Sequence, residues 1–405
     1  MKKMFIVGML LLIITLPTVG AAMIAVDVSH GEGTVALVSP IVDPTTGKVI
    51  AEGIIPTLSW YEWGYFGYSY ELNKAGVKRL GDTITYDSLK DVDVLIIGKL
   101  REELSPDEIR AIVKWFSEGQ KVLWISGDSE RELGAYVQKN ANALLEAIPG
   151  AKLRIDYVTT KDTFSYAGKT AYVSGFVRVD IETPDGSILT KGYQGEVGKV
   201  LFHEPGVLAW VDENQKWHKL VAGEIPPGVY RIVTTSGNGV IEDDYAPEGR
   251  TYASWEQGLF TLLAVEFVEL PEGGESLLIV SAESPYGDPV PIWVNRYGSY
   301  LFDGQQFVTN LLRWALLQSE KMTPRIETTT TITTATTTTT TTTTETSPTT
   351  TTRSPSPTTS SESPSFTTST TTVAEENAVP TWIIGVIMVL GIGALVLAFL
   401  LLRGR

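Results

Sequence analysis

The chain contains no cysteine and very little histidine. None of its 405 residues is Cys, and only His30, His203 and His218 carry an imidazole. Thiol nucleophiles, thiolate metal ligands and iron–sulfur ligands are therefore excluded, and a histidine-based metal site has few donors. Because no disulfide can form, the protein must hold its core together by packing.

Basic residues are also scarce. The chain has 32 Lys and Arg against 47 Asp and Glu, which gives a net charge of −15. Nucleic acid requires clustered positive charge, so we expect no nucleic-acid partner. The sequence also lacks an Asn-x-Ser/Thr sequon, so any glycan should be O-linked.

The first 22 residues have the pattern of a secretory signal. Lys2 and Lys3 precede the apolar stretch Met4–Leu16, and the small residues Gly20, Ala21 and Ala22 follow it. A positive start, an apolar centre and small residues before the cleavage point predict a signal peptide over residues 1–22. The alternative, an uncleaved anchor, requires a longer apolar stretch than this one.

The C-terminal part predicts a stalk and a membrane anchor. Residues 323–379 are rich in Thr, Ser and Pro, and such a tract cannot bury enough apolar surface to fold. Residues 380–402 contain the uncharged run Trp382–Leu402, which at 1.5 Å per residue matches a hydrocarbon core of about 30 Å. With Arg403 and Arg405 on the cytoplasmic side, we expect a single-pass type I protein of the cell membrane with its large N-terminal domain outside.

Strands and helices alternate in residues 23–150. Met23–Val28, Asp91–Gly98 and Lys121–Ile125 read as buried strands, and Glu71–Leu80 has helical spacing. Ser105 followed by Pro, Asp and Glu forms a capping box that predicts a helix ending near Gly119, and another helix should run to about Ala147. This order is typical of a parallel sheet with right-handed crossovers.

Residues 151–272 change to short β-rich segments separated by Gly, Pro and Asp, which we interpret as an insertion. The expected strands of the insertion are Leu153–Val158, Thr170–Ile181, Lys199–His203, Val207–Val211 and Val229–Thr234. Residues 273–322 return to the α/β pattern, with a strand at Ser276–Ser281 and a helix at Gln305–Gln318. The predicted fold class is thus α/β, with a parallel sheet and a β-rich insertion.

Several of these segments together resemble the class I glutamine-amidotransferase-like domain. The likeness rests on Asp27–Glu32 after the first strand, the helix entry over Gly64–Leu80, Asp93–Ile97, the capped helix at Ser105, Lys121–Asp128 and the closing strand and helix. It covers about Met23–Ala147 and Ser276–Gln318, and is strongest to the uncharacterised, exported and membrane-anchored members. The resemblance implies a flavodoxin-like parallel sheet.

The residues that carry catalysis in that family are missing. The resemblance implies a nucleophilic Cys at a strand–turn–helix elbow, where this chain has Ser126, Gly127 and Asp128. It also implies a late His-x-Glu pair, where this chain has Ser281, Ala282 and Glu283 without a histidine. We therefore expect no glutaminase activity, and a non-catalytic domain without a cofactor is the favoured interpretation.

Polar residues follow the first strand and should lie at the carboxyl edge of the sheet, where open α/β sheets bind ligands. These are Asp27, Ser29, His30 and Glu32. They could bind a polar ligand or one divalent metal, or they could satisfy only local backbone groups. Our prediction is a ligand site and no metal site.

Two further groups are candidates for the same site. Trp63, Tyr65 and Tyr68 belong to an aromatic loop that could stack on a sugar ring or a partner, or could pack onto the core. Ser126 and Asp128 could cap a helix or present its N-terminus to a ligand. Tyr286, after the returning strand, could close the crevice.

The sequence therefore predicts a surface-anchored binding domain for a small polar or saccharide ligand, or for a protein partner of the cell envelope. The competing hypotheses are a hydrolase that uses Ser126 or a metal at His30, and a structural envelope protein. The sequence does not distinguish the ligand from the partner.

The first prediction concerns topology. Because the signal, the stalk, the apolar run and the terminal arginines agree, protease added to intact cells should release a soluble fragment that ends within Thr323–Asn377. Mass spectrometry of the released fragment checks the end point. Recovery of the large domain from the cytosol alone would contradict this topology.

Overall fold

The computed structural model describes residues 22–30, 41–42, 49–51, 56–60, 66–70, 77–131, 135–192, 195–286 and 290–325. All of them belong to the compact unit Met1–Thr331. The predicted signal peptide up to residue 21, the stalk beyond residue 325, the predicted transmembrane helix and the tail lie outside the described residues. Within the described ranges, no helix is both long and apolar enough to cross a membrane.

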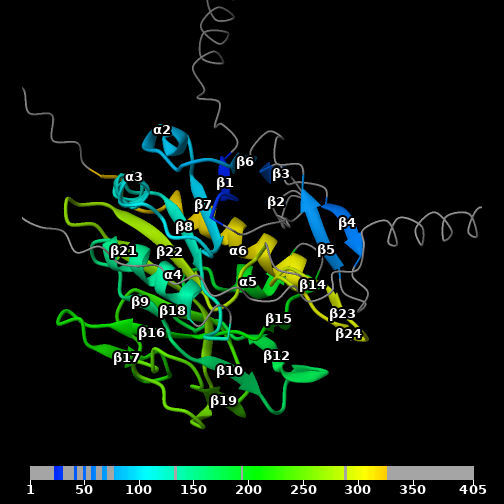
Figure 1. The fold of residues 1–405 in the computed structure, drawn as a ribbon. Coiled ribbons are helices and arrows are strands. Elements are labelled where there is room, and N and C mark those ends of the chain that lie inside the picture. The colour runs from blue at the N-terminus through cyan, green and yellow to red at the C-terminus, as the bar shows by residue number, and fades with distance from the viewer. Residues whose placement is uncertain are drawn as a thin grey trace, which may run out of the picture. The chain divides into compact units, whose positions relative to one another are not determined.

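One sheet of ten strands forms the centre of this unit (Figure 1). Its strands are β1 (Ile24–Asp27), β6 (Val77–Leu80), β7 (Val94–Lys99), β8 (Val122–Ser126), β11 (Tyr166–Ala167), β12 (Lys169–Val177), β15 (Lys199–His203), β18 (Val229–Thr234), β21 (Thr261–Glu269) and β22 (Glu275–Ser281). The order is β11-β12-β18-β21-β22-β8-β7-β1-β6, and β15 pairs with β12 outside this path. Pairings from β6 to β22 are parallel, whereas those from β22 to β11 are antiparallel.

Smaller sheets surround it. The three-stranded ones are β10 (Thr159–Asp162), β19 (Gly239–Glu242) and β20 (Gln257–Gly258), and β17 (Trp217–Lys219), β16 (Val207–Val211) and β9 (Leu153–Asp156). The two-stranded ones are β2 (Ile41–Val42) with β3 (Val49–Ala51), β4 (Pro56–Trp60) with β5 (Phe66–Tyr70), β13 (Lys191–Gly192) with β14 (Gly195–Glu196), and β23 (Arg296–Tyr297) with β24 (Tyr300–Leu301).

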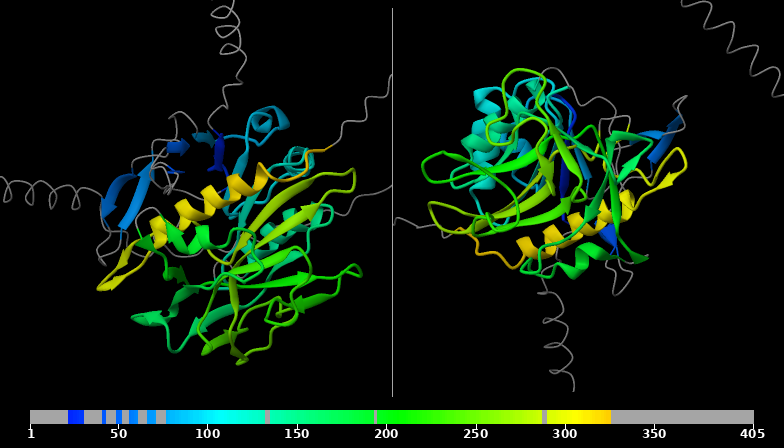
Figure 2. Two further views of the ribbon diagram at one scale, coloured as in Figure 1. Left: turned by 180° about the vertical axis from the view of Figure 1, so that it is seen from behind. Right: turned by 90° about the horizontal axis from the view of Figure 1, so that it is seen from below.

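The described helices cover the two faces of the parallel part of the sheet (Figure 2). They are α2 (Tyr86–Leu89), α3 (Pro106–Phe116), α4 (Tyr136–Ala147), α5 (Ser187–Thr190) and α6 (Gly304–Ser319). Alternate residues of β7 point to opposite faces. Leu95 and Ile97 therefore pack in the cluster that contains α3 and α4, and Val94 and Ile96 pack in the cluster that contains α6.

The predicted fold class is wrong. We expected a parallel, flavodoxin-like α/β sheet interrupted by a β-rich insertion, but the protein is β-rich, with a mixed, curled sheet and few helices. Strands β12, β18 and β21, which fall in the expected insertion, continue the main sheet because β21 pairs along the full length of β22. An apolar strand such as β22 has the same sequence pattern beside a parallel or an antiparallel neighbour, so the pattern could not give the strand direction.

Individual elements were predicted better than their arrangement. The capping box at Ser105 is present and begins α3, and Gly119 has the expected positive φ of 81°. The helix predicted over Glu71–Leu80 is wrong at its C-terminal end, since Val77–Leu80 is strand β6. The helical spacing there was overridden by parallel pairing with β1.

Candidate functional site

The carboxyl ends of four parallel strands meet at one edge of the sheet. Val26 of β1 lies beside Ile96 of β7, and Ser126 of β8 lies between Lys99 of β7 and Ser281 of β22. The segments that follow these strands carry several buried polar side chains. This edge is the place that the sequence indicated for a site.

Asp27, Ser29 and His30 form one hydrogen-bonded cluster after β1. The Asp27 carboxylate contacts His30 Nδ1 at 2.7 Å and accepts from the Ser29 hydroxyl at 2.7 Å and its backbone N–H at 3.0 Å. On its other side, His30 Nε2 lies 3.3 Å from Glu108 Oε1, at the start of α3. Both ring nitrogens of His30 therefore face carboxylates, which favours the doubly protonated imidazolium.

Glu108 is held by the capping box of α3. Its Oε2 accepts from the Ser105 backbone N–H at 2.9 Å, and its Oε1 accepts from the Ile84 backbone N–H at 2.9 Å. The residue that caps the helix thus also supplies the second carboxylate for His30. Because His30 contacts both Asp27 at the end of β1 and Glu108 of α3, the cluster links the end of β1 to α3.

The pKa values in this cluster shift in opposite directions. Burial alone would lower the pKa of His30, but its hydrogen bonds and attraction to Asp27 and Glu108 raise that pKa above the ordinary 6.5. Burial would likewise raise the pKa of Asp27, and the hydrogen bond and charge of His30 lower it below 3.8. For Glu108, burial is outweighed mainly by the backbone N–H donors of Ile84 and Ser105, and the pKa falls below 4.5.

A buried lysine occupies the middle of the edge. Lys99 Nζ lies 2.5 Å from Asp128 Oδ2 and 3.3 Å from Glu283 Oε1, and these three residues are at most 2% exposed. A charge in the interior persists only when it is paired, and here one ammonium faces two carboxylates. The ion pairs join the ends of β7, β8 and β22.

Ser126 and Tyr286 are also buried at this edge. Ser126 Oγ lies 3.3 Å from Ser281 Oγ, and the structure gives its side chain no other hydrogen-bond partner. The Tyr286 hydroxyl donates to the Asp27 carbonyl oxygen at 2.6 Å and accepts from the Gly98 backbone N–H at 2.8 Å. Tyr286 therefore links the segment after β22 to the ends of β1 and β7.

The structure brings together some of the predicted site residues. Asp27, Ser29 and His30 are in mutual contact, and Tyr286 contacts Asp27. Asp128 forms an ion pair with Lys99, the residue that follows Gly98 in β7. Glu32, Trp63 and Tyr65 lie outside the described residues, and of Tyr68 only the backbone is described, in strand β5. A ligand-binding role for these ten residues stays a prediction.

Sequence reasoning missed Lys99, Glu108 and Glu283 as members of this edge. Lys99 left a usable signal, since it is the only charge in the apolar run from Val94 to Leu100. Glu108 was recognised only as a capping residue, because nothing in the sequence places it beside His30. In the described ranges, no group of three His, Cys, Asp or Glu side chains is placed to hold a metal ion.

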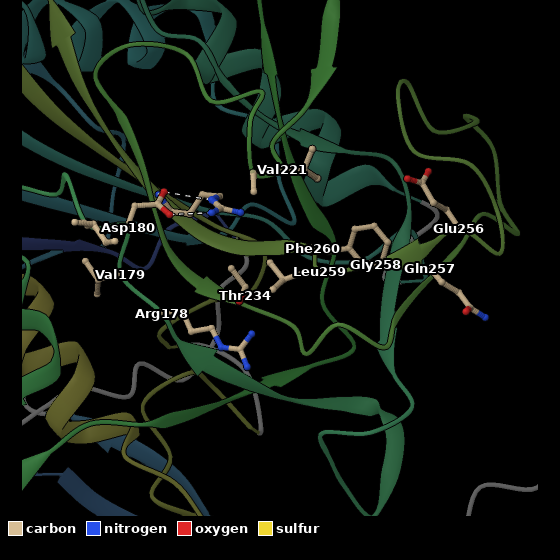
Figure 3. Close-up of a pocket in the computed structure, with 13 residues that line it drawn as sticks. Arg178, Val179, Asp180, Val221, Thr234, Glu256, Gln257, Gly258, Leu259 and Phe260 are labelled. Carbon is tan, nitrogen blue, oxygen red and sulfur yellow. Dashed lines mark hydrogen bonds and ion pairs between the residues drawn. The ribbon is translucent and has the colours of Figure 1, made fainter.

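Two cavities lie elsewhere, in the β-rich part. The first, which we name the Trp210 cavity, has a volume of about 780 Å³ and is bounded by the end of α4, β9, the β16–β17 turn and residues 224–227. The second, which we name the Arg178 cavity, has a volume of about 520 Å³ and is bounded by residues 178–181, β18 and residues 256–260 (Figure 3). None of the predicted site residues lines either cavity.

The Trp210 cavity contains polar atoms that lack internal partners. Arg154 is 2% exposed and its Nε, like Nε1 of Trp210, is buried without a hydrogen-bond partner in the structure. The Trp210 ring stacks on His218 with 4.4 Å between centroids, and His218 Nε2 lies 3.1 Å from Asp212 Oδ2. The turn residues Glu213, Asn214 and Gln215 are exposed along the cavity.

Comparisons with known proteins identify no family. No family model matches the chain, and no curated protein matches it. Among solved structures, the "mmIFT52 N-terminal domain" is 13% identical, with 59% of this chain and 83% of that chain covered and a TM-score of 0.36. A "Putative thua-like protein from Bacteroides uniformis" is 12% identical, with 60% and 78% covered and a TM-score of 0.32. Likeness at this level supports neither a fold family nor a function, and the amidotransferase resemblance stays a prediction.

The His30 cluster should make stability depend on pH. With a raised pKa, His30 stabilises the fold fully below about pH 6.5 and loses this effect as the pH rises through the folded-state pKa. With lowered pKa values, Asp27 and Glu108 stabilise the fold above about pH 4.5 and lose this effect as the pH falls. The contribution of the cluster should therefore be largest between about pH 4.5 and 6.5.

Urea denaturation of the wild type and of His30→Asn at several pH values measures this contribution as a difference. The difference in unfolding free energy should shrink above about pH 6.5. Ser29→Ala keeps all three charges and should retain the dependence of the wild type. A difference that stays constant from pH 5 to pH 9 would mean that His30 is not charged in the folded protein.

Lys99→Met should strongly destabilise the protein. The substitution removes the ammonium that faces the buried Asp128 and Glu283 carboxylates, and removal of one partner from a buried ion pair typically costs about 3–5 kcal/mol. Lys139→Met, which removes an exposed lysine of α4, should change stability by no more than about 0.5 kcal/mol. Chemical denaturation of both variants is the measurement, and equal stability of Lys99→Met and the wild type would rule out a buried ion-pair role.

Proposed function

We propose that this chain is a surface-anchored, non-catalytic binding domain whose ligand is a neutral saccharide or a similar small polar molecule. The observation that carries the proposal is the Trp210 cavity, which combines an aromatic ring with unpartnered polar atoms in a volume of about 780 Å³. The sequence pattern of signal, stalk and apolar run supports display at the cell surface.

The carboxyl edge is poorly suited to hydrolysis. A serine nucleophile needs a base within hydrogen-bond reach, and among the described residues the buried Ser126 side chain has only Ser281 as a hydrogen-bond partner. The nitrogens of His30 face Asp27 and Glu108, and His203 and His218 stack on Tyr172 and Trp210 in the β-rich part. These contacts favour binding over the serine-hydrolase alternative.

The Trp210 cavity has the size and chemistry of a small-molecule site. Ligand cavities are typically about 300–1,000 Å³ and place a few polar groups among apolar ones. The Trp210 indole contributes apolar surface to the cavity, and carboxylates, amides and guanidinium groups match sugar hydroxyls. The Nε of Arg154 and Nε1 of Trp210 have less than 1 Å² of accessible surface each, so a ligand hydroxyl or a water satisfies them only when neighbouring side chains shift.

The charges around the cavity favour a neutral ligand. Its lining includes the carboxylates of Glu146, Asp212, Glu213 and Glu224, but only two cations, Lys152 and Arg154. An acidic sugar would be repelled by this excess of negative charge, whereas a neutral sugar can donate its hydroxyl protons to the carboxylates.

A thermal-shift screen of the purified full-length protein against neutral saccharides, with glucuronate as the acidic comparison, tests the proposal. A ligand at 100 times its dissociation constant should stabilise the protein by about 2.7 kcal/mol. The double variant Glu213→Ala/Asn214→Ala alters two exposed residues of the cavity and should abolish this shift. The matched double variant Glu248→Ala/Asn238→Ala, at exposed positions outside both cavities, should keep it.

Two outcomes would contradict the proposal. Saccharide binding that survives in the Glu213→Ala/Asn214→Ala variant would move the site away from the Trp210 cavity. Labelling of the wild type by a fluorophosphonate, lost in Ser126→Ala, would make the protein a serine hydrolase instead.

A further inference from the structure

The Arg178 cavity is separate from the Trp210 cavity and has a different chemistry. The two share no lining residue. The Arg178 cavity is formed where the chain leaves β12, beside β18 and the segment from Glu256 to Phe260. Figure 3 shows Asp180 and Val179 on one side of the view, Glu256 and Gln257 on the other, and Thr234 and Leu259 between them.

Two buried donors in this cavity lack a partner. Arg231 binds Asp180 in a bidentate manner, with Nη2–Oδ1 at 2.9 Å and Nε–Oδ2 at 3.2 Å, and this pairing fixes the guanidinium plane. Its remaining nitrogen, Nη1, is buried without a hydrogen-bond partner, and so is the hydroxyl of Thr234, which is 2% exposed. Buried polar groups are nearly always satisfied, so these two donors of lining residues suit an external acceptor. Each atom has less than 1 Å² of accessible surface, so an acceptor in the cavity reaches it only when neighbouring side chains shift.

One lining charge is not neutralised. Asp180 pairs with Arg231, and Glu256 Oε1 accepts from Lys219 Nζ at 2.6 Å. Arg178 is exposed, lies 4.4 Å over the Phe176 ring through its guanidinium carbon, and forms no ion pair in the structure. The charges of the lining residues themselves balance, and Lys219, which pairs with Glu256 from outside the lining, brings a local excess of one positive charge in a chain whose net charge is −15.

The rest of the lining is largely apolar. Val179, Val221, Leu259 and Phe260 line the cavity, and Phe260 is 1% exposed. A ligand that fits both parts has one negative charge and an apolar body. A phosphate dianion fits less well, because it is strongly hydrated and the Asp180 and Glu256 carboxylates line the same cavity.

We propose that the Arg178 cavity binds an organic monocarboxylate with an apolar body. The carboxylate neutralises Arg178 and, after neighbouring side chains shift on binding, accepts hydrogen bonds from Arg231 Nη1 and the Thr234 hydroxyl. The apolar body packs against Leu259 and Phe260. Guanidinium groups suit this acceptor because their planar donors match the two oxygens of a carboxylate. The proposal does not depend on saccharide binding at the Trp210 cavity.

Isothermal titration of the purified full-length protein with phenylacetate tests the proposal, with phenylacetamide as the neutral isostere and glucuronate as the hydrophilic carboxylate. Phenylacetate should bind at least about tenfold more tightly than either comparison, since a hydrogen bond to a charged group is worth about that factor or more. Equal affinity for the acid and the amide, or for phenylacetate and glucuronate, would overturn the proposal, as would the absence of carboxylate binding.

Variants locate the site. Arg178→Gln removes an exposed charge and should weaken phenylacetate binding by about tenfold, and Thr234→Val removes the hydroxyl with little change in shape. Arg250→Gln removes another exposed positive charge, outside the cavity, and should leave the affinity unchanged. Glu213→Ala/Asn214→Ala should also leave it unchanged, so failure of this site and failure of the saccharide site are separate results. Equal loss in Arg178→Gln and Arg250→Gln would overturn the assignment to this cavity.

Discussion

The buried ion pairs of Lys99 are the interaction on which the arrangement of the main sheet depends most. Lys99 Nζ contacts Asp128 and Glu283, and these three residues follow or end the adjacent strands β7, β8 and β22. Strand β22 is also where the sheet changes, since it pairs in parallel with β8 and antiparallel with β21. The same ammonium thus holds the strand that joins the two halves of the protein.

The parallel half of the sheet contains the Lys99 ion pairs, and the β-rich half contains the two cavities. Around Lys99, polar groups satisfy each other: Asp27, His30 and Glu108 form a second closed cluster, and Tyr286 connects it to Gly98. In the β-rich half, Arg154, Trp210, Arg231 and Thr234 line cavities and carry buried donors that lack partners. Unsatisfied donors in the interior are costly, and a ligand or water that satisfies them recovers that free energy.

The two proposed ligands differ because the two cavities differ in charge. Carboxylates outnumber cations around the Trp210 cavity, whereas Arg178 leaves one unpaired positive charge in the other. In a chain with a net charge of −15, most of the surface repels anions, so a carboxylate must be recognised by a local group. Because the two cavities share no lining residue, each can bind its own ligand.

The sequence by itself determined the local elements and several members of the edge. Capping at Ser105, the continuous apolar run of β7, the apolar spacing of α6 and the polar residues after β1 depend on neighbours within a few positions, so the chain displays them directly. Only the tertiary structure decided that β21 would pair with β22, that Glu108 would reach His30 across 78 residues of sequence, and that Lys99 would lie between Asp128 and Glu283. Strand direction and long-range ion pairs depend on which elements pack together in the folded protein. The same pattern of apolar and polar residues is compatible with several such arrangements, so the sequence alone does not select one.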